Sequence, residues 1–153
     1  MNSRRRQRGF SVLEALVVIV LLGITAAVAS SLVKERVLSA RIRVAADQLA
    51  FDLRAARLKA VSNRTPVDVI VTVDPANRYE YTDTYGRLRA RELAPGVRIV
   101  SSSSPIVFQS NGSVTGGAST LLEADVSSSA VERWTIDTTV LGNPRVSHER
   151  VSP

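Results

Sequence analysis

The sequence of 153 residues contains no cysteine and only one histidine, His148. Without cysteine, the chain forms neither disulfides nor thiolate metal sites. With one histidine and no cluster of ligand-type residues at metal-binding spacing, it also lacks a recognisable metal site. The sequence has no Walker-type loop and no paired acids of a catalytic centre. These absences argue against an enzyme and predict neither a metal nor another cofactor.

Proline is missing from the first 65 residues, and charge is nearly missing from residues 9–33. Within that run of 25 residues, Glu14 is the only charged side chain. The run is longer than the roughly 20 apolar residues that cross a bilayer as a helix. Because a helix satisfies its own backbone hydrogen bonds in lipid, residues 10–33 are predicted to form a transmembrane helix.

Residues 34–63 continue the helical pattern beyond the apolar run. Apolar residues recur every three or four positions, which is the spacing of one helix face. They are Val37 or Leu38, Ile42, Ala45 or Ala46, Leu49, Leu53, Ala56 and Ala60. The positions between them carry Arg41, Arg43, Asp47, Asp52, Arg54, Arg57 and Lys59. Asn63 followed by Pro66 predicts the helix end, so one helix of about 80 Å is expected over residues 10–62.

After Pro66 the apolar residues alternate with a period of two. Val67, Val69 and Val71 are separated by single residues, which is the pattern of a half-buried strand. Further strands are predicted around residues 79–81, 88–93, 97–100, 106–108, 121–126, 134–140 and 145–147. Residues 111–112, Asn-Gly, are expected to form a hairpin turn. The expected fold is therefore α+β, with one long N-terminal helix packed on antiparallel β-sheet in residues 64–153.

The formal net charge of +6 is concentrated at the N-terminus. Arg4, Arg5, Arg6 and Arg8 belong to the first nine residues, and the remaining chain has 16 basic and 14 acidic side chains. A basic segment before an apolar run keeps the N-terminus of a membrane protein in the cytoplasm. We therefore interpret residues 1–9 as an orientation signal rather than as a nucleic-acid-binding segment.

An ordinary secretory signal peptide is the alternative interpretation of this region. Ala27, Val28 and Ala29 before Ser30 match a small-residue cleavage site after an apolar stretch. A carboxylate inside such a stretch costs about 2.5–3.5 kcal/mol on insertion scales, and Glu14 lies within it. The helical pattern also continues through this cleavage site, which a signal peptide does not require. An uncleaved membrane anchor is a further alternative.

Residues 9–14, with the sequence Gly-Phe-Ser-Val-Leu-Glu, resemble the leader junction of type IV pilins and type II secretion pseudopilins. The resemblance implies that prepilin peptidase cuts after Gly9 and methylates the new amine of Phe10. It also implies that Glu14 directs filament assembly. A carboxylate in lipid needs a partner, and the Phe10 amine of a neighbouring subunit would supply one. The alternative for Glu14 is a chance charge near the helix start.

Beyond the leader, the chain resembles the minor pseudopilins, which include the H-type subunit of type II secretion, and the related minor pilins of DNA uptake. The similarity lies in residues 53–73, 108–112 and 134–145. It implies two small sheets on the helix and a place as a minor subunit in a periplasmic pseudopilus. The implied partners are prepilin peptidase, other pseudopilins and the bacterial inner membrane, with the N-terminus cytoplasmic and the C-terminal domain periplasmic.

A nucleic-acid-binding minor pilin of a type IV pilus is the alternative function. Such pilins are expected to carry a Gly-Arg-x-Arg motif in a C-terminal loop, and residues 142–145 read Gly-Asn-Pro-Arg. Arg145 and Arg150 would form one basic segment, and Arg87 and Arg89 another. Acidic residues interrupt both segments, whereas phosphate binding favours an unbroken positive face. Charges at a solvated strand edge would explain the same arginines.

The second half of the helix also leads to an expectation about neighbouring subunits. Its apolar face is expected to cover the sheet, and its Arg/Asp face is expected to meet adjacent subunits in the filament. Reversing the charge of Arg54 or Arg57 should then impair assembly and leave the β domain folded.

Processing of the leader can be tested by mass spectrometry of the N-terminal peptide of the chain purified from its native host. We expect a mature chain that begins at an N-methylated Phe10, because the peptidase motif precedes the apolar run directly. A chain beginning at Ser30 would identify an ordinary signal peptide. A chain retaining Arg4 to Arg8 would identify an uncleaved anchor.

Overall fold

The computed structural model describes residues 11–73, 77–82, 85–127 and 130–152, and it gives side-chain burial for all of these except residues 28–32. The predicted leader and cleavage site, residues 1–10, lie outside the described residues. The chain divides into two compact units, Met1–Lys34 and Glu35–Pro153. One helix, α1, contributes residues to both.

Helix α1 spans Val12–Asn63, so the predicted long helix is confirmed to within two residues at its start and one at its end. At its C-terminal end Arg64 adopts a left-handed conformation, with φ of 54°. The backbone N–H of Thr65 donates to the carbonyl oxygen of Ala60 at 3.2 Å. This is the hydrogen bond of a Schellman ending, and Pro66 then prevents the helix from continuing.

In the unit Met1–Lys34, the described side chains of residues 11–27 are all exposed. The hydroxyl of Thr25 donates to the carbonyl oxygens of Leu21 and Leu22, so this polar group is satisfied within the helix itself. In the described part of the chain, no helix is both long enough and apolar enough to cross a membrane.

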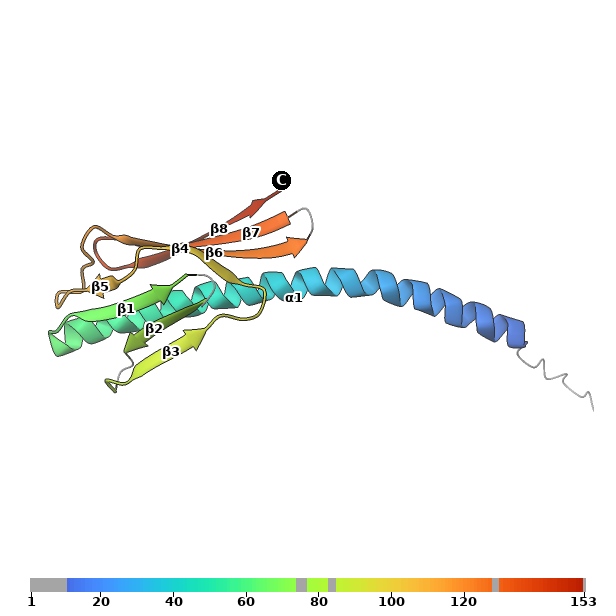
Figure 1. Ribbon diagram of the computed structural model, residues 1–153, viewed down its shortest axis with the longest axis horizontal. Coiled ribbons are helices and arrows are strands. Elements are labelled where there is room, and N and C mark those ends of the chain that lie inside the picture. The colour runs from blue at the N-terminus through green and yellow to red at the C-terminus, as the bar shows by residue number, and fades with distance from the viewer. Residues whose placement is uncertain (1–10, 74–76, 83–84, 128–129, 153) are drawn as a thin grey trace, which may run out of the picture. The chain divides into compact units, whose positions relative to one another are not determined.

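The unit Glu35–Pro153 contains two four-stranded antiparallel sheets (Figure 1). The first sheet has the strand order β3-β2-β1-β5, and the second has the order β4-β6-β7-β8. The strands are β1 Val67–Thr72, β2 Arg78–Thr82, β3 Leu88–Glu92, β4 Arg98–Ser102, β5 Ile106–Phe108, β6 Ala118–Ser127, β7 Ala130–Thr138 and β8 Pro144–Val151. The expected α+β class is confirmed, as are the two sheets that the family resemblance implied.

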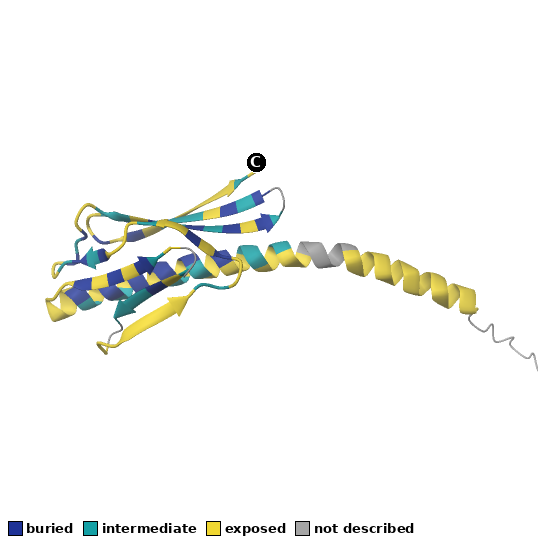
Figure 2. Cartoon of the chain, in the orientation of Figure 1, coloured by how far each residue is buried: buried dark blue, intermediate teal, exposed yellow. Residues whose placement is uncertain are grey.

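The core of this unit lies between α1 and the inner faces of both sheets (Figure 2). The helix contributes residues of its predicted apolar face, together with Ala50, which was not predicted. They are Ile42, Ala46, Leu49, Ala50, Leu53, Ala56 and Ala60, each at most 1% exposed. The first sheet contributes Val69, Tyr79 and Phe108, and the second contributes Ile99, Leu122 and Ile136. Full burial of one such large side chain contributes about 1.5–3 kcal/mol. The helix is therefore the shared element against which both sheets are packed.

Asp52 departs from the expectation that it lies on the charged face of the helix. It is 3% exposed. Its carboxylate accepts hydrogen bonds from the Tyr79 hydroxyl at 2.7 Å and from the Gln48 amide at 3.2 Å, and Arg91 Nε lies 3.3 Å away. Burial and the hydrogen bond to Asp52 raise the pKa of Tyr79, so the phenol remains a neutral donor. Asp52 is thus a buried acceptor that connects α1 with β2 and β3.

The predicted strands are all present, but the last three extend beyond their predicted ranges. Strand β6 spans Ala118–Ser127 rather than residues 121–126. Strand β7 begins at Ala130 rather than at residue 134, and β8 ends at Val151 rather than at residue 147. The two strands remain paired to their ends, where Val131 is opposite Val151. Cross-strand pairing extends these strands through polar residues that show no clear alternation in the sequence.

The Asn111-Gly112 segment forms a tight turn, and the N–H of Gly112 donates to the carbonyl of Gln109 at 2.7 Å. The turn follows β5 and precedes β6, which belong to different sheets. Across the turn, Phe108 and Val114 form an antiparallel bridge, and the N–H of Gln109 donates to the carbonyl oxygen of Ser113 at 2.8 Å. The expected hairpin turn is therefore confirmed locally, although β5 and β6 belong to different sheets.

The importance of the buried carboxylate can be tested by comparing Asp52→Ala with Asp47→Ala. Asp47 is exposed and lies 3.9 Å from Arg43. We expect Asp52→Ala to lower the free energy of unfolding by about 2–3 kcal/mol, because the buried Tyr79 hydroxyl loses its charged acceptor. The change at Asp47 should cost less than about 0.5 kcal/mol.

The measurement is denaturant unfolding of the full chain in detergent micelles, followed by the fluorescence of Trp134, the only tryptophan. Equal effects of the two substitutions would contradict a structural role for Asp52.

Candidate functional site

The predicted processing and assembly residues lie at the start of the chain. Gly9 and Phe10 are outside the described residues, and Glu14 is exposed in the first turn of α1. The backbone N–H of Glu14 donates to the carbonyl oxygen of Ser11 at 3.0 Å. Ser11 therefore occupies the capping position, and Glu14 occupies the third helical position, where the helix dipole favours an acid. Glu14 thus has a local role at the helix start, and its role in assembly stays a prediction.

Arg57 connects the C-terminal part of α1 with two turns of the β-rich unit. Its Nε donates to the carbonyl oxygen of Gly112 at 3.1 Å, and its Nη1 donates to Oδ1 of Asn143 at 2.8 Å. Gly112 and Gly142 are both buried and have positive φ. A Cβ added to Gly142 would collide with the Gly112 carbonyl and lie 3.0 Å from Arg57 Nε. The two turns and the guanidinium are therefore packed too closely for any other residue at position 142.

Arg54 and Arg57 were expected to face adjacent subunits, and the structure corrects this for Arg57. Arg57 is half-buried and bonded within the unit, so reversing its charge would disturb the fold itself. Arg54 stays exposed, and its guanidinium donates to the carbonyl oxygen of Pro144 at 3.4 Å. Arg54, on the charged face of the helix, therefore also helps to hold the start of β8.

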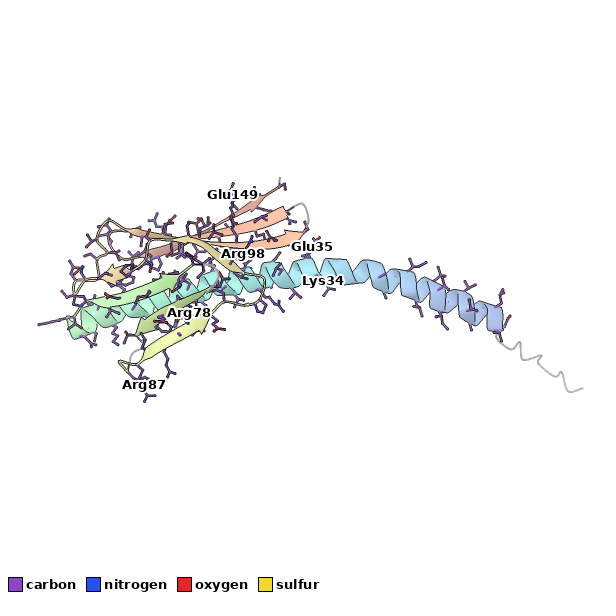
Figure 3. The ribbon with its side chains drawn as sticks, in the orientation of Figure 1. Lys34, Glu35, Arg78, Arg87, Arg98 and Glu149 are labelled. Atoms are coloured by element: carbon purple, nitrogen blue, oxygen red, sulfur yellow. The ribbon has the colours of Figure 1, made fainter. Side chains whose placement is uncertain are left out.

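The four arginines considered for nucleic-acid binding lie in two separate places. Arg87 precedes β3 and Arg89 lies within it, whereas Arg145 and Arg150 lie on β8. Strands β3 and β8 are outer strands of different sheets. Figure 3 labels Arg87 and Glu149 of β8 on opposite sides of the β-rich unit. The fold therefore does not bring the two pairs into one basic patch.

On β8, acidic side chains on the neighbouring strand accompany both arginines. Arg145 is opposite Asp137 in the register, and Arg150 is opposite Glu132. Opposite charges on directly paired residues stabilise a sheet and reduce its positive potential. This arrangement fits a solvated strand edge better than an unbroken phosphate-binding face.

A second apolar stripe on α1 was not anticipated from the sequence. Val37, Val44, Phe51 and Leu58, hereafter the outer stripe, have exposed fractions of 42%, 65%, 63% and 68%. They follow one another at intervals of seven residues. The last three each lie two positions from buried residues on both sides, which places them about 200° around the helix from the core. The seven-residue spacing was visible in the sequence, but the stronger pattern of the buried face obscured it.

Two family comparisons match this chain. Residues 4–30 match the prokaryotic N-terminal methylation motif, and residues 45–142 match the family described as type II transport protein GspH. The second match covers more than half of the chain. The chain belongs to the GspH family. The expected resemblance to pseudopilins is confirmed.

Two solved structures share the fold of this GspH-family chain. The minor pseudopilin EpsH from the type 2 secretion system of Vibrio cholerae aligns with a TM-score of 0.52 and 13% identity, covering 74% of this chain and 98% of EpsH. The type IV minor pilin FimU of Pseudomonas aeruginosa (strain PAO1) aligns with a TM-score of 0.50 and 18% identity, covering 73% and 92%. Comparison with curated sequences finds no significant match. The pilin-like fold is thereby confirmed.

In this GspH-family chain, Asn143 stands where the DNA-uptake motif would have its first arginine. Its side chain accepts the hydrogen bond from Arg57 Nη1. An arginine at this position would bring a second guanidinium to the one already there, and like charges at that distance repel. Position 143 therefore serves the packing of the turn.

The contribution of the turn contact can be tested by comparing Arg57→Ala with Arg43→Ala. We expect Arg57→Ala to lower the free energy of unfolding by about 1–2 kcal/mol, because a buried carbonyl and the Asn143 amide lose their donor. Arg43 is exposed and forms only a weak pair with Asp47 at 3.9 Å, so its loss should cost less than about 0.5 kcal/mol. Trp134 fluorescence in a denaturant titration is the measurement. If Arg57→Ala leaves the denaturant midpoint of unfolding unchanged, a structural role for Arg57 would be contradicted. The expectation that it faces only neighbouring subunits would then stand.

Proposed function

We propose that this chain is a minor pseudopilin, a structural subunit of the periplasmic pseudopilus of a type II secretion system, and not an enzyme. The order of the two family matches carries the proposal. The methylation motif at residues 4–30 is followed by the GspH region at residues 45–142. A chain with this order combines a processed, apolar N-terminal segment with a folded β-rich unit, which is what assembly from a membrane into a filament requires.

Processing and anchoring follow from the N-terminal segment. Prepilin peptidase is the proposed partner that cuts after Gly9 and methylates the amine of Phe10. Residues 10–33 would then hold the subunit in the inner membrane before assembly, with the β-rich unit in the periplasm. Support comes from the four arginines of the leader, the single charge within residues 9–33, and the match to the methylation motif.

Assembly with other pseudopilins is proposed to depend on Glu14. The side chain is exposed on α1, so another chain has access to it. A carboxylate surrounded by lipid is costly, and the methylated Phe10 amine of a neighbouring subunit would neutralise it. Because the pair forms only when two subunits have the correct axial offset, the same interaction would set their register.

A minor pilin of a type IV pilus, involved in pilus assembly or DNA uptake, is the second candidate. The similarity in fold to FimU favours it, because that alignment is nearly as close as the one to EpsH. DNA contact would involve Arg145 and Arg150 on one sheet edge or Arg87 and Arg89 on another. The separation of these edges and the acidic residues opposite the β8 arginines make this candidate the weaker one.

The two candidates can be separated by deleting the gene in the native host and measuring extracellular hydrolase activity and uptake of labelled DNA in parallel. We expect secretion to fall at least tenfold with normal DNA uptake, and Glu14→Ala to reproduce the loss because the filament register is broken. Glu149→Ala, an exposed acid on β8, is the matched control and should secrete normally. Normal secretion with lost DNA uptake would assign the chain to the pilus class and make Arg145 the next residue to test.

A further inference from the structure

The only histidine of the chain lies beside a buried carboxylate at the outer edge of the second sheet. His148 belongs to the outer strand β8 (Figure 1), and its Nε2 lies 3.8 Å from Oε2 of Glu132 on β7. Glu132 is 7% exposed, whereas the side chain of His148 is 41% exposed. A ring that exchanges protons with solvent is therefore next to an acid that is removed from solvent.

Glu132 needs a charged partner more than an exposed acid does. Its Oε1 accepts a hydrogen bond from the Ser39 hydroxyl of α1 at 2.8 Å, which satisfies only part of a carboxylate. Among the described residues, His148 has the only basic side chain within 4 Å of this carboxylate. Because a buried carboxylate without an opposite charge is costly, a positive imidazole at this place stabilises the folded state.

A second contact of His148 favours the same positive form. Its ring lies on the ring of Trp134, with the centroids 4.6 Å apart and the planes inclined by 34°. Trp134 is directly opposite His148 in the register of β7 and β8. A cation within about 6 Å of an aromatic centroid is attracted by the face of the ring. The indole and the carboxylate therefore both stabilise protonated His148.

The other charges around His148 are of both signs. Arg150 lies two residues further along β8 on the same face, and its charge opposes a positive imidazole. Strand β6 places Ala124 opposite Glu132 and adds no charge there. Three charged residues of α1 lie one turn from Ser39, namely Glu35, which is half-buried, and Arg36 and Arg43, which are exposed. Solvent screens the exposed arginines, so the nearby Glu132 carboxylate has the larger effect.

We propose that protonation of His148 fastens strand β8 to β7 and, through Glu132 and Ser39, to helix α1. The folded state offers the proton a carboxylate and an indole face, which the unfolded chain does not. The fold is therefore stabilised when His148 takes up its proton and loses this stabilisation as the pH rises. Histidine is the side chain that ordinarily changes charge between about pH 5 and pH 8, and the chain has one. This behaviour belongs to the β-rich unit and is the same in either candidate filament.

Urea unfolding of the full chain in detergent micelles tests this dependence at about pH 5.5 and about pH 8. The wild type is compared with His148→Gln, which keeps a polar side chain but cannot become positive. We expect the urea midpoint of the variant to lie about 0.5 M below that of the wild type at the lower pH. At the higher pH this difference should shrink by at least half. A difference that shrinks by less than half, or grows, would overturn the proposal.

A double-mutant cycle identifies the carboxylate that is involved. Glu132→Gln keeps an acceptor for the Ser39 hydroxyl and removes the charge. We expect its loss of stability to add to that of His148→Gln at about pH 8, whereas at about pH 5.5 the double variant should lose less than the sum. The matched control is Glu149→Gln, because Glu149 is exposed and its side chain lies on the opposite face of the sheet. It should be additive with His148→Gln at both pH values. Additivity of Glu132→Gln at the lower pH would contradict a role for this carboxylate.

The emission of Trp134 reports on the ring contact directly, since it is the only tryptophan. In the folded chain without urea, we expect the emission intensity of the wild type to change in one step between about pH 5 and pH 8. The emission of His148→Gln should stay constant, because no charge then forms over the indole. This titration and the His148→Gln comparison decide the matter even if Glu132→Gln does not fold. A wild-type emission that stays constant over this range would exclude the protonation of His148 against Trp134.

Discussion

The burial of one face of α1 against two small sheets is the constraint on which the rest of the β-rich unit depends. Each sheet has four strands and one face to remove from water, and neither sheet covers the other without the helix. Leu49 and Leu53 are fully buried in this shared core, while the alanines of the same helix face leave room for the strands to approach. Loss of the helix would therefore expose the inner faces of both sheets at once.

Two polar contacts complement this apolar packing and give the helix a defined register on the strands. Asp52 receives the Tyr79 hydroxyl and lies beside Arg91, so it holds the edge strand β3 as well as β2. Arg57 holds the turns after β5 and after β7. A buried carboxylate and a half-buried guanidinium are stable only with their partners in place, so each contact favours one arrangement of helix and strands over the alternatives. Two charged residues of α1, Asp52 and Arg57, thus help to hold the fold together.

Helix α1 carries apolar residues on two faces. One face is buried in the core, and the outer stripe is exposed in the isolated chain. The fold itself is shared by EpsH, a minor pseudopilin of a type 2 secretion system, and FimU, a type IV minor pilin. Exposed residues can change without disturbing the core, so one fold can serve in different assemblies.

The sequence by itself determined the long helix, its buried face, the strand positions and the pilin-type leader, because each rests on local periodicity or a short motif. Residues 42–60 illustrate this, since their apolar period is a property of one helix. Only the tertiary structure decided which strands belong to each sheet, the burial of Asp52, the inward role of Arg57 and the separation of Arg87 from Arg145. These features depend on residues that are distant in the chain, such as Asp52 with Tyr79 and Arg91, and no local pattern carries that pairing.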